Sequence, residues 1–301
     1  MRTPGQVPRR LRVEGFTADD AQALGMSRSR LRSGDIQHPF QGVNVVGTAP
    51  TTLVARCRAL AAKLPAESRF CGPTAAILQG LPLPGRLEKS LIVHVAVARG
   101  TRTLVGRGIR GHTYLRTPDD TRMWNGLAIS SPERVWCELA AELDLGDLVA
   151  VGDHLVHRDL PATSIAALGR AIGAWPGRRG MRMLVEAHPL LSDRSESRKE
   201  SQLRVIVVTA GIPGVRANYE IRTLSGFTYR GDLAIPERKL IIEYQSGFHN
   251  SPEAFRADMT RISRLATDGW YVMQVNSDDL RDPLELCQRI WRVLADRPTF
   301  G

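Results

Sequence analysis

Residues 227–245, FTYRGDLAIPERKLIIEYQ, contain two apolar segments separated by a turn. Phe227–Leu233 and Lys239–Gln245 are rich in aromatic and β-branched residues, which favours two strands. Ile235–Arg238 contains proline and charged residues, which is typical of a turn between strands. The stretch is therefore predicted to form two neighbouring strands of a sheet in the last third of the chain.

Two carboxylates stand near the ends of these strands. Glu243 and Gln245 are two residues apart, so they leave one face of the strand, while Leu240 and Ile242 point the other way, into the core. Asp232 comes level with Glu243 only if the hairpin is offset or bulged. Paired carboxylates repel each other unless a cation joins them, and their oxygens suit Mg²⁺. The alternative is that both are solvated residues at strand ends.

Helices and strands are predicted on both sides of this hairpin. In chain order they are a helix at 200–210, a strand at 215–221, the hairpin itself, a helix that begins at Ser251, a strand at 270–275 and a helix at 283–295. This order predicts an α/β (α+β) domain over 193–301, in which helices flank a mixed sheet. The polar stretch at 192–199 is predicted to be the linker that precedes it.

The domain at 193–301 resembles the PD-(D/E)XK nuclease superfamily. Asp232, followed after ten residues by Glu243-Tyr244-Gln245, is similar to the core motif of that superfamily. A longer set of residues resembles an uncharacterised bacterial domain family related to the very-short-patch-repair endonucleases. The set consists of Ser197, Glu200, Ser201, Arg230, Asp232, Ile242, Glu243, Tyr244, His249, Phe255, Asp258, Arg261, Gly269 and Trp270.

The resemblance implies a restriction-endonuclease-like sheet and hydrolysis of DNA with Mg²⁺ or Mn²⁺. It implies that Asp232 and Glu243 ligate the metal and that Glu200 adds a further carboxylate from the first helix. The metal would activate water and stabilise charge on the phosphate. His249, just after the strand, would act as an acid or base or contact phosphate.

Three further residues belong to this implied site. Gln245 stands where the superfamily motif has lysine; it cannot carry a positive charge or take a proton, but it can orient a water molecule by hydrogen bonds. Asp258 and Arg261 are three residues apart on the next helix and are expected to brace the site as an ion pair. Alternatively, they are a solvated pair on the helix surface.

Residues 1–50 are predicted to form a winged helix-turn-helix-like module. The expected elements are a helix at 18–24, a helix at 28–34 and a hairpin at 38–46. Arg28 and Arg32 fall on one face of the second helix and are predicted to contact DNA. The alternative is a small helical subdomain with solvated arginines. Residues 51–192 are predicted to be a mixed α/β region, and 15–190 resembles the winged-helix regions of AbiEi-type antitoxin-like proteins.

The charge balance also favours DNA as a partner. The chain has 41 Lys and Arg against 31 Asp and Glu, a net charge of +10, and 37 of the 41 are arginine. A GC-rich genome alone would produce the same bias. No run approaches the roughly 18 apolar residues of a membrane span, and the N-terminus has no secretory signal, so a cytoplasmic protein without a membrane partner is expected.

Two functions follow from these observations. One is a Mg²⁺-dependent DNA endonuclease with an N-terminal DNA-binding module. The other is a non-catalytic DNA-binding transcriptional regulator, or an antitoxin-like protein, that retains a nuclease fold. The presence of Glu200, Asp232 and Glu243 together favours the enzyme, because a regulator has no need for all three. Neither the DNA sequence nor any protein partner is indicated.

Overall fold

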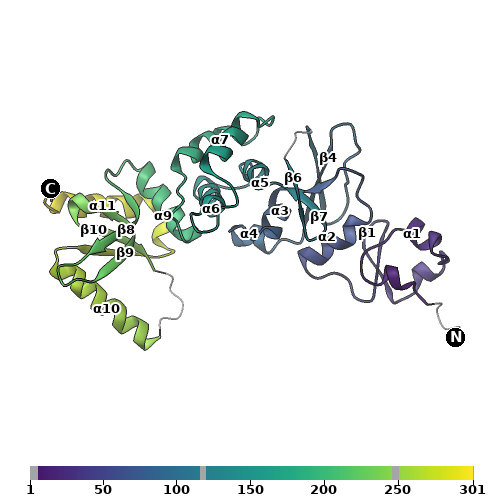
Figure 1. Cartoon of the computed structure of the whole chain (residues 1–301), viewed down its shortest axis with the longest axis horizontal. Helices are drawn as coiled ribbons and strands as arrows, with labels where there is room; N and C mark the ends of the chain where they lie inside the picture. The colour runs from purple at the N-terminus through teal and green to yellow at the C-terminus, as the bar shows by residue number, and fades with distance from the viewer. Residues whose placement is uncertain (1–5, 116–119, 246–250, 301) are drawn as a thin grey trace. The chain divides into compact units, whose positions relative to one another are not determined.

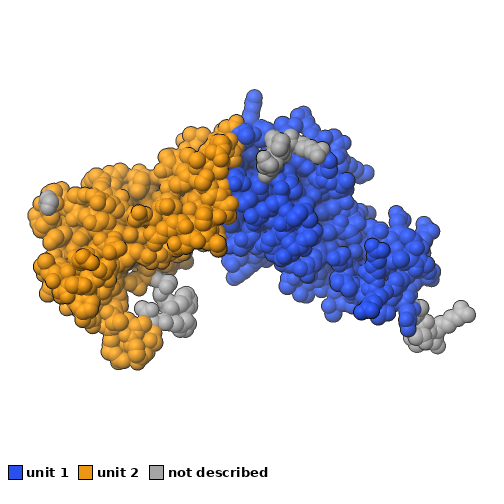
Figure 2. Space-filling view, in the orientation of Figure 1, with its two compact units in different colours: residues 1–139, 174–178 blue, residues 140–173, 179–301 orange. Residues whose placement is uncertain are grey.

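The structure is a computed structural model that describes residues 6–115, 120–245 and 251–300. The chain forms two compact units (Figure 2). Unit 1 comprises residues 1–139 and 174–178, and unit 2 comprises 140–173 and 179–301. Both contain helices and strands, which confirms the predicted mixed α/β class. The division differs from the three segments predicted at 1–50, 51–192 and 193–301.

Unit 1 begins with a small helical and hairpin region. Helix α1 (Ala18–Ala23) has Thr17 as its N-cap, which forms a reciprocal capping box with Asp20. Gly25, at φ +79°, follows the helix in the left-handed conformation that favours glycine. Strands β1 (Ile36–Phe40) and β2 (Val43–Val46) then form an antiparallel hairpin. The predicted first helix and hairpin are therefore confirmed.

The prediction of a second α-helix at 28–34 is wrong. The segment forms only one 3-10 turn, Arg30–Arg32. The hydroxyl of Ser27 accepts the Arg30 N–H, and the Arg30 guanidinium donates to both carboxylate oxygens of Asp35, at 2.7 and 2.6 Å. These contacts hold the backbone in a tight turn, so Arg28 and Arg32 are exposed but do not share a helical face.

The larger part of unit 1 is a five-stranded sheet in the order β5-β4-β3-β7-β6. Its strands are β3 (Arg69–Phe70), β4 (Val93–Ala98), β5 (Ile109–Tyr114), β6 (Thr121–Trp124) and β7 (Leu127–Ser130). Its helices are α2 (Leu53–Ala61), α3 (Gly72–Leu78), α4 (Gly85–Glu88) and α5 (Pro132–Leu139). In β4 the valines at 93, 95 and 97 are buried, as are the histidine and alanine at 94 and 96.

Unit 2 opens with four α-helices, which are α6 (Leu145–Val156), α7 (Ile165–Gly173), α8 (Met181–Ala187) and α9 (Arg198–Thr209). Of these, α6 packs against α9 and α8 packs against α6. Asp153 of α6 is almost fully buried and accepts hydrogen bonds from the Ser192 N–H and the Ser201 hydroxyl, each at 2.7 Å. It also forms an ion pair with Arg204 of α9. The polar stretch expected to be a linker is thus bound to α6 and lies within one compact unit.

The C-terminal sheet of unit 2 has the strand order β11-β10-β9-β8. Its strands are β8 (Arg216–Arg222), β9 (Thr228–Ile235), β10 (Leu240–Tyr244) and β11 (Tyr271–Val275), and the later helices are α10 (Pro252–Thr267) and α11 (Pro283–Asp296) (Figure 1). Strand β10 pairs antiparallel with β9 and parallel with β11. No helix in the described part of the chain is long and apolar enough to cross a membrane.

Helices cover both faces of this sheet. Leu240 and Ile242 of β10 face a core that contains side chains from α9 and α11, as predicted. Ile241 faces the other way and packs with Leu265 of α10. Because successive strand residues alternate between faces, Glu243 is assigned to the α10 face. The two layers therefore bring the end of β10 close to both α9 and α10.

Candidate functional site

Asp232 and Glu243 occupy corresponding positions at the end of the β9–β10 hairpin. Leu240 pairs with Ile235 and Ile242 with Leu233, so Glu243 and Asp232 are the next residues on the two strands. The expectation that they come level only through an offset or a bulge is wrong. The connection has four residues and ends at Lys239 in a left-handed conformation (φ +47°), so the register runs straight to both carboxylates.

The side chain of Asp232 points toward the end of β10. Its Oδ2 accepts the backbone N–H of Tyr244 at 2.9 Å. On β9, Leu233 packs in the core with α9 and α11, whereas Tyr229 packs on the α10 side, so the apolar alternation changes near Asp232. Asn218, next to this point on β8, has φ +48°. The Asp232 carboxylate thus lies beside the β10 backbone at a point where the alternation of β9 is irregular.

Glu243 is held by an arginine of α10. Both carboxylate oxygens accept hydrogen bonds from the Arg261 guanidinium at 2.6 Å, while only 8% of the Glu243 side chain is exposed. Arg261 also donates to Oδ1 of Asp258, from Nε at 3.0 Å and from Nη2 at 2.6 Å. These hydrogen bonds raise the pKa of Arg261. The expected Asp258–Arg261 pair is present, and it is joined to Glu243.

The carboxyl group of Asp232 is energetically unfavourable in its charged form. Burial, together with the negative charges of Glu200 and Glu243, raises the pKa of Asp232 to about 6 against the lowering effect of the Tyr244 hydrogen bond. Glu200 lies in the first turn of α9 and accepts the N–H of Glu196 at 3.0 Å. The three predicted metal ligands therefore influence one another electrostatically.

The three carboxylates do not form a ready-made ligand set. Within the described ranges, no group of three His, Cys, Asp or Glu side chains is arranged to hold a metal ion. Glu200 accepts a backbone hydrogen bond at the start of α9, and Glu243 is paired with Arg261. Carboxylate oxygens suit a hard divalent cation, and Asp232 and Glu243 are the two carboxylates that the hairpin register brings next to each other. His249 lies outside the described residues.

A cavity of about 690 Å³ adjoins these groups on the α10 side. It is lined in part by Gln245, Asp258 and Arg261, three of the predicted site residues. The backbone N–H of Gln245 donates to the Val275 carbonyl at 2.7 Å, which extends the pairing of β10 with β11. The cavity thus brings a neutral hydrogen-bonding side chain, an acid and a guanidinium to one surface.

Three residues of this cavity were missed by the sequence analysis. Phe227 and Tyr229 are two residues apart on and beside β9 and stack on each other, with ring centroids 6.3 Å apart. The Arg264 guanidinium lies 3.8 Å from the Phe227 ring centroid and donates to the Tyr229 hydroxyl at 3.2 Å. Their spacing in the sequence could have indicated this cluster, because two aromatic residues two apart along a strand share a face, and two arginines three apart on a helix also share one.

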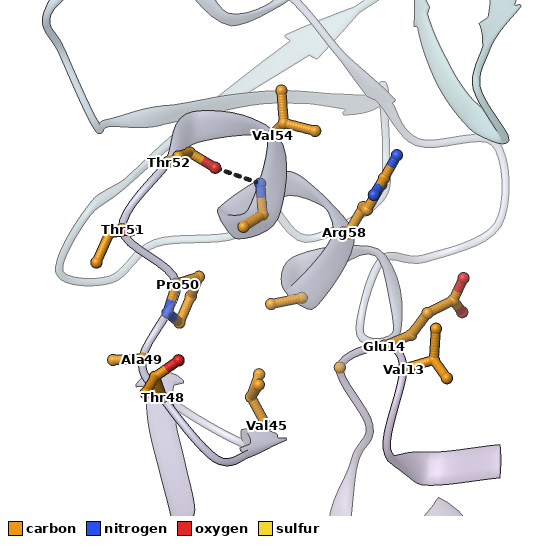
Figure 3. Close-up of a pocket in the computed structure, with 13 residues that line it drawn as sticks. Val13, Glu14, Val45, Thr48, Ala49, Pro50, Thr51, Thr52, Val54 and Arg58 are labelled. Atoms are coloured by element: carbon orange, nitrogen blue, oxygen red, sulfur yellow. Dashed lines mark hydrogen bonds between the residues drawn. The ribbon is translucent and has the colours of Figure 1, made fainter. Parts of the chain in front are cut away.

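Two further cavities lie in unit 1. One of about 340 Å³ lies between the loop at 48–52 and helix α2 (Figure 3). Its lining includes Glu14 and Arg58 but is otherwise mostly small and apolar, and Thr52 at its rim caps α2 by accepting the Ala55 N–H at 3.2 Å. It contains no cluster of chemically reactive side chains. Arg28 and Arg32, the predicted DNA contacts, also belong to unit 1.

Two proteins of Mycobacterium tuberculosis are similar to this chain. They are uncharacterized protein MT2308 of strain CDC 1551 / Oshkosh and uncharacterized protein Rv2248 of strain ATCC 25618 / H37Rv. Each is 28% identical over 267 residues, which cover 88% of this chain and 94% of the relative. No protein-family model matches the chain, and no solved structure matches it.

Proposed function

We propose that unit 2 is a metal-dependent DNA endonuclease that uses Mg²⁺ or Mn²⁺. The observation that carries the proposal is the position of Asp232 beside Glu243, where burial and neighbouring negative charge raise the pKa of Asp232 to about 6. A cation between the two carboxylates would remove that penalty. The resemblance of 193–301 to PD-(D/E)XK nucleases assigns the same two residues to metal binding.

The proposed active form requires a rearrangement at Glu243. Glu243 would hold the cation in place of the Arg261 guanidinium, and Arg261 would keep Asp258, its second partner. When bound, the metal supplies activation of water and stabilisation of charge on the phosphate. Gln245 orients the attacking water by hydrogen bonds, and Arg264 contributes a positive charge to the cavity that receives the DNA.

A second candidate is a DNA-binding regulator, or an antitoxin-like protein, without catalysis. The Glu243–Arg261 pair supports it, because a guanidinium inside the fold already neutralises the buried carboxylate. In that case no metal is needed to stabilise the strand end. The two candidates differ in one outcome, which is whether DNA is cut when a divalent ion is supplied.

Cleavage of plasmid and linear DNA in Mg²⁺ or Mn²⁺, with EDTA as the blank, tests the proposal. We expect Asp232→Asn and Glu243→Gln to reduce cleavage by at least about 100-fold, whereas Asp278→Asn, an exposed carboxylate of the same unit, leaves it unchanged. Gln245→Leu should lose most activity and Gln245→Lys should retain it. Equal cleavage by wild type and both carboxylate variants contradicts the proposed site. No cleavage by any protein favours the regulator.

A further inference from the structure

The net positive charge of the protein belongs to unit 1. The sequence of unit 1 has 21 Lys and Arg against 10 Asp and Glu, whereas unit 2 has 20 against 21. Unit 1 thus has a net charge of +11 and unit 2 a net charge of −1, so the whole excess belongs to the unit without the candidate nuclease site. A polyanion is attracted by such a field and held where the cations are accessible.

Unit 1 has a groove that concentrates accessible cations. The groove has a volume of about 890 Å³ and lies between the β1–β2 hairpin, the chain just after α2 and the connection from β4 to β5. Lys63, Arg102 and Arg107 line it, together with His38. All four side chains are exposed, and no Asp or Glu is among the lining residues that the structure describes. The groove therefore presents positive charge without a competing carboxylate.

The cations of the groove are available for a ligand. Among the described residues, none of Lys63, Arg102 and Arg107 forms an ion pair. The Nζ of Lys63 donates to the Gln41 carbonyl at 2.6 Å, which holds this ammonium group beside the hairpin turn. Gly42, in that turn, has φ +75° and lies close to the Lys63 side chain. One cation is thus positioned beside the hairpin turn, and the other two belong to the connection from β4 to β5.

The floor of the groove is apolar and supported from behind. Phe40 of β1 is 3% exposed and lines the groove. The guanidinium of Arg56, on α2, stacks against its ring at 4.7 Å from the centroid and donates to the Leu91 carbonyl at 2.9 Å. Arg56 therefore connects the hairpin to the sheet of unit 1. A supported concave surface lined by three cations fits a protruding, negatively charged chain.

We propose that this groove binds the phosphate backbone of DNA and that Lys63, Arg102 and Arg107 are its phosphate contacts. A concave groove admits the ridge of a phosphodiester backbone, whereas a flat anionic membrane reaches only its rim. Phosphate contacts of this type give affinity without sequence specificity. The inference rests on DNA as the partner in the proposed function, but it does not depend on cleavage.

The test compares two triple variants with the same loss of charge. The groove variant is Lys63→Gln, Arg102→Gln and Arg107→Gln, and the control replaces three exposed arginines of unit 1 outside the groove, Arg9, Arg10 and Arg122, by Gln. Binding of a labelled DNA duplex is measured by fluorescence anisotropy from 50 to 200 mM KCl in EDTA, where no metal-dependent cleavage occurs. Circular dichroism confirms that both variants are folded.

We expect the groove variant to bind DNA at least tenfold more weakly than the wild type. The slope of the logarithm of the binding constant against the logarithm of the salt concentration (the salt slope) should become less steep by up to about 2.7, because each lost phosphate contact removes roughly 0.9. The control should lower the slope by less than about 1. An equal loss in both variants overturns the inference, since only overall charge would then matter. A groove variant whose DNA affinity is unchanged also overturns the inference. If only the double variant Arg28→Gln and Arg32→Gln loses DNA affinity, the phosphate contact lies at the turn that contains these two arginines and not in the groove.

Two further measurements separate this inference from the proposed function. Asp232→Asn should bind DNA like wild type but fail to cut it, and the groove variant should still cut at low salt and saturating DNA. A wild type that binds but never cuts leaves the groove assignment standing and removes the nuclease. Vesicles of anionic phospholipid are the second probe. If the groove variant loses vesicle binding while its DNA binding is unchanged, the groove inference is contradicted.

Discussion

Replacing Arg261 by Gln tests how Glu243 is stabilised. In the native protein, two hydrogen bonds of 2.6 Å join the Arg261 guanidinium to Glu243, whose side chain is 8% exposed. The variant leaves this carboxylate buried without its cation. We therefore expect Arg261→Gln to destabilise unit 2 in the absence of metal, and we expect Mn²⁺ or Mg²⁺ to reverse part of the loss by binding at the carboxylates.

The size of the effect follows from burial. Removing one member of a buried ion pair costs about 3 to 5 kcal/mol in the free energy of unfolding. Because 20% of the Arg261 side chain is exposed, the lower end, about 3 kcal/mol, is expected. For a unit of this size that corresponds to a fall in Tm of about 6 to 12 °C. A metal at 100 times its Kd would restore about 2.7 kcal/mol.

Thermal unfolding followed by circular dichroism, with and without 5 mM Mn²⁺, measures both effects. The matched control is Arg256→Gln, one turn earlier on α10, whose partner Glu253 is exposed, so its Tm should not change. The wild-type protein should gain less from Mn²⁺ than Arg261→Gln does, because Arg261 competes with the metal for Glu243. If Mn²⁺ stabilises the variant no more than the wild type, the idea that Arg261 and a cation share one carboxylate is refuted.

Two other perturbations test the energetics of unit 2. The folded-state pKa of Asp232, about 6, lies above its ordinary value of 3.8, so the stability contributed by its protonated form is fully present below about pH 4 and lost as the pH rises through 6. Asp232→Asn removes this loss of stability. Its free energy of unfolding in urea should equal that of the wild type near pH 4 and exceed it by about 2 to 3 kcal/mol at pH 7.5. A difference that stays constant with pH would contradict the raised pKa. Asp153→Ala removes the acceptor for Ser192, Ser201 and Arg204 and should cost about 3 to 5 kcal/mol in the same assay, as expected if α6 and α9 unfold together. A loss below about 1 kcal/mol would mean that α6 does not stabilise the C-terminal sheet.

Local patterns were sufficient for most elements of the C-terminal sheet. The apolar runs at 227–233 and 239–245, separated by a proline-containing turn, indicated the β9–β10 hairpin, and Ser251-Pro252 indicated the start of α10. These signals act over a few residues, because side-chain alternation and capping hydrogen bonds are local. For the same reason, the sequence itself placed Glu243 and Gln245 at the end of a strand.

Only the tertiary structure decided which groups neutralise the buried charges. Glu243 and Arg261 are 18 residues apart, and their pairing depends on how α10 packs across the sheet. Asp153 and Arg204 are 51 residues apart, and their contact makes α6 part of unit 2 rather than of a separate middle region. At 28–34 the helical pattern gave way to the Arg30–Asp35 pair and a 3-10 turn. Sequence spacing determines the face of an element on which a side chain lies, whereas its partner depends on the packing of elements that are distant in the chain.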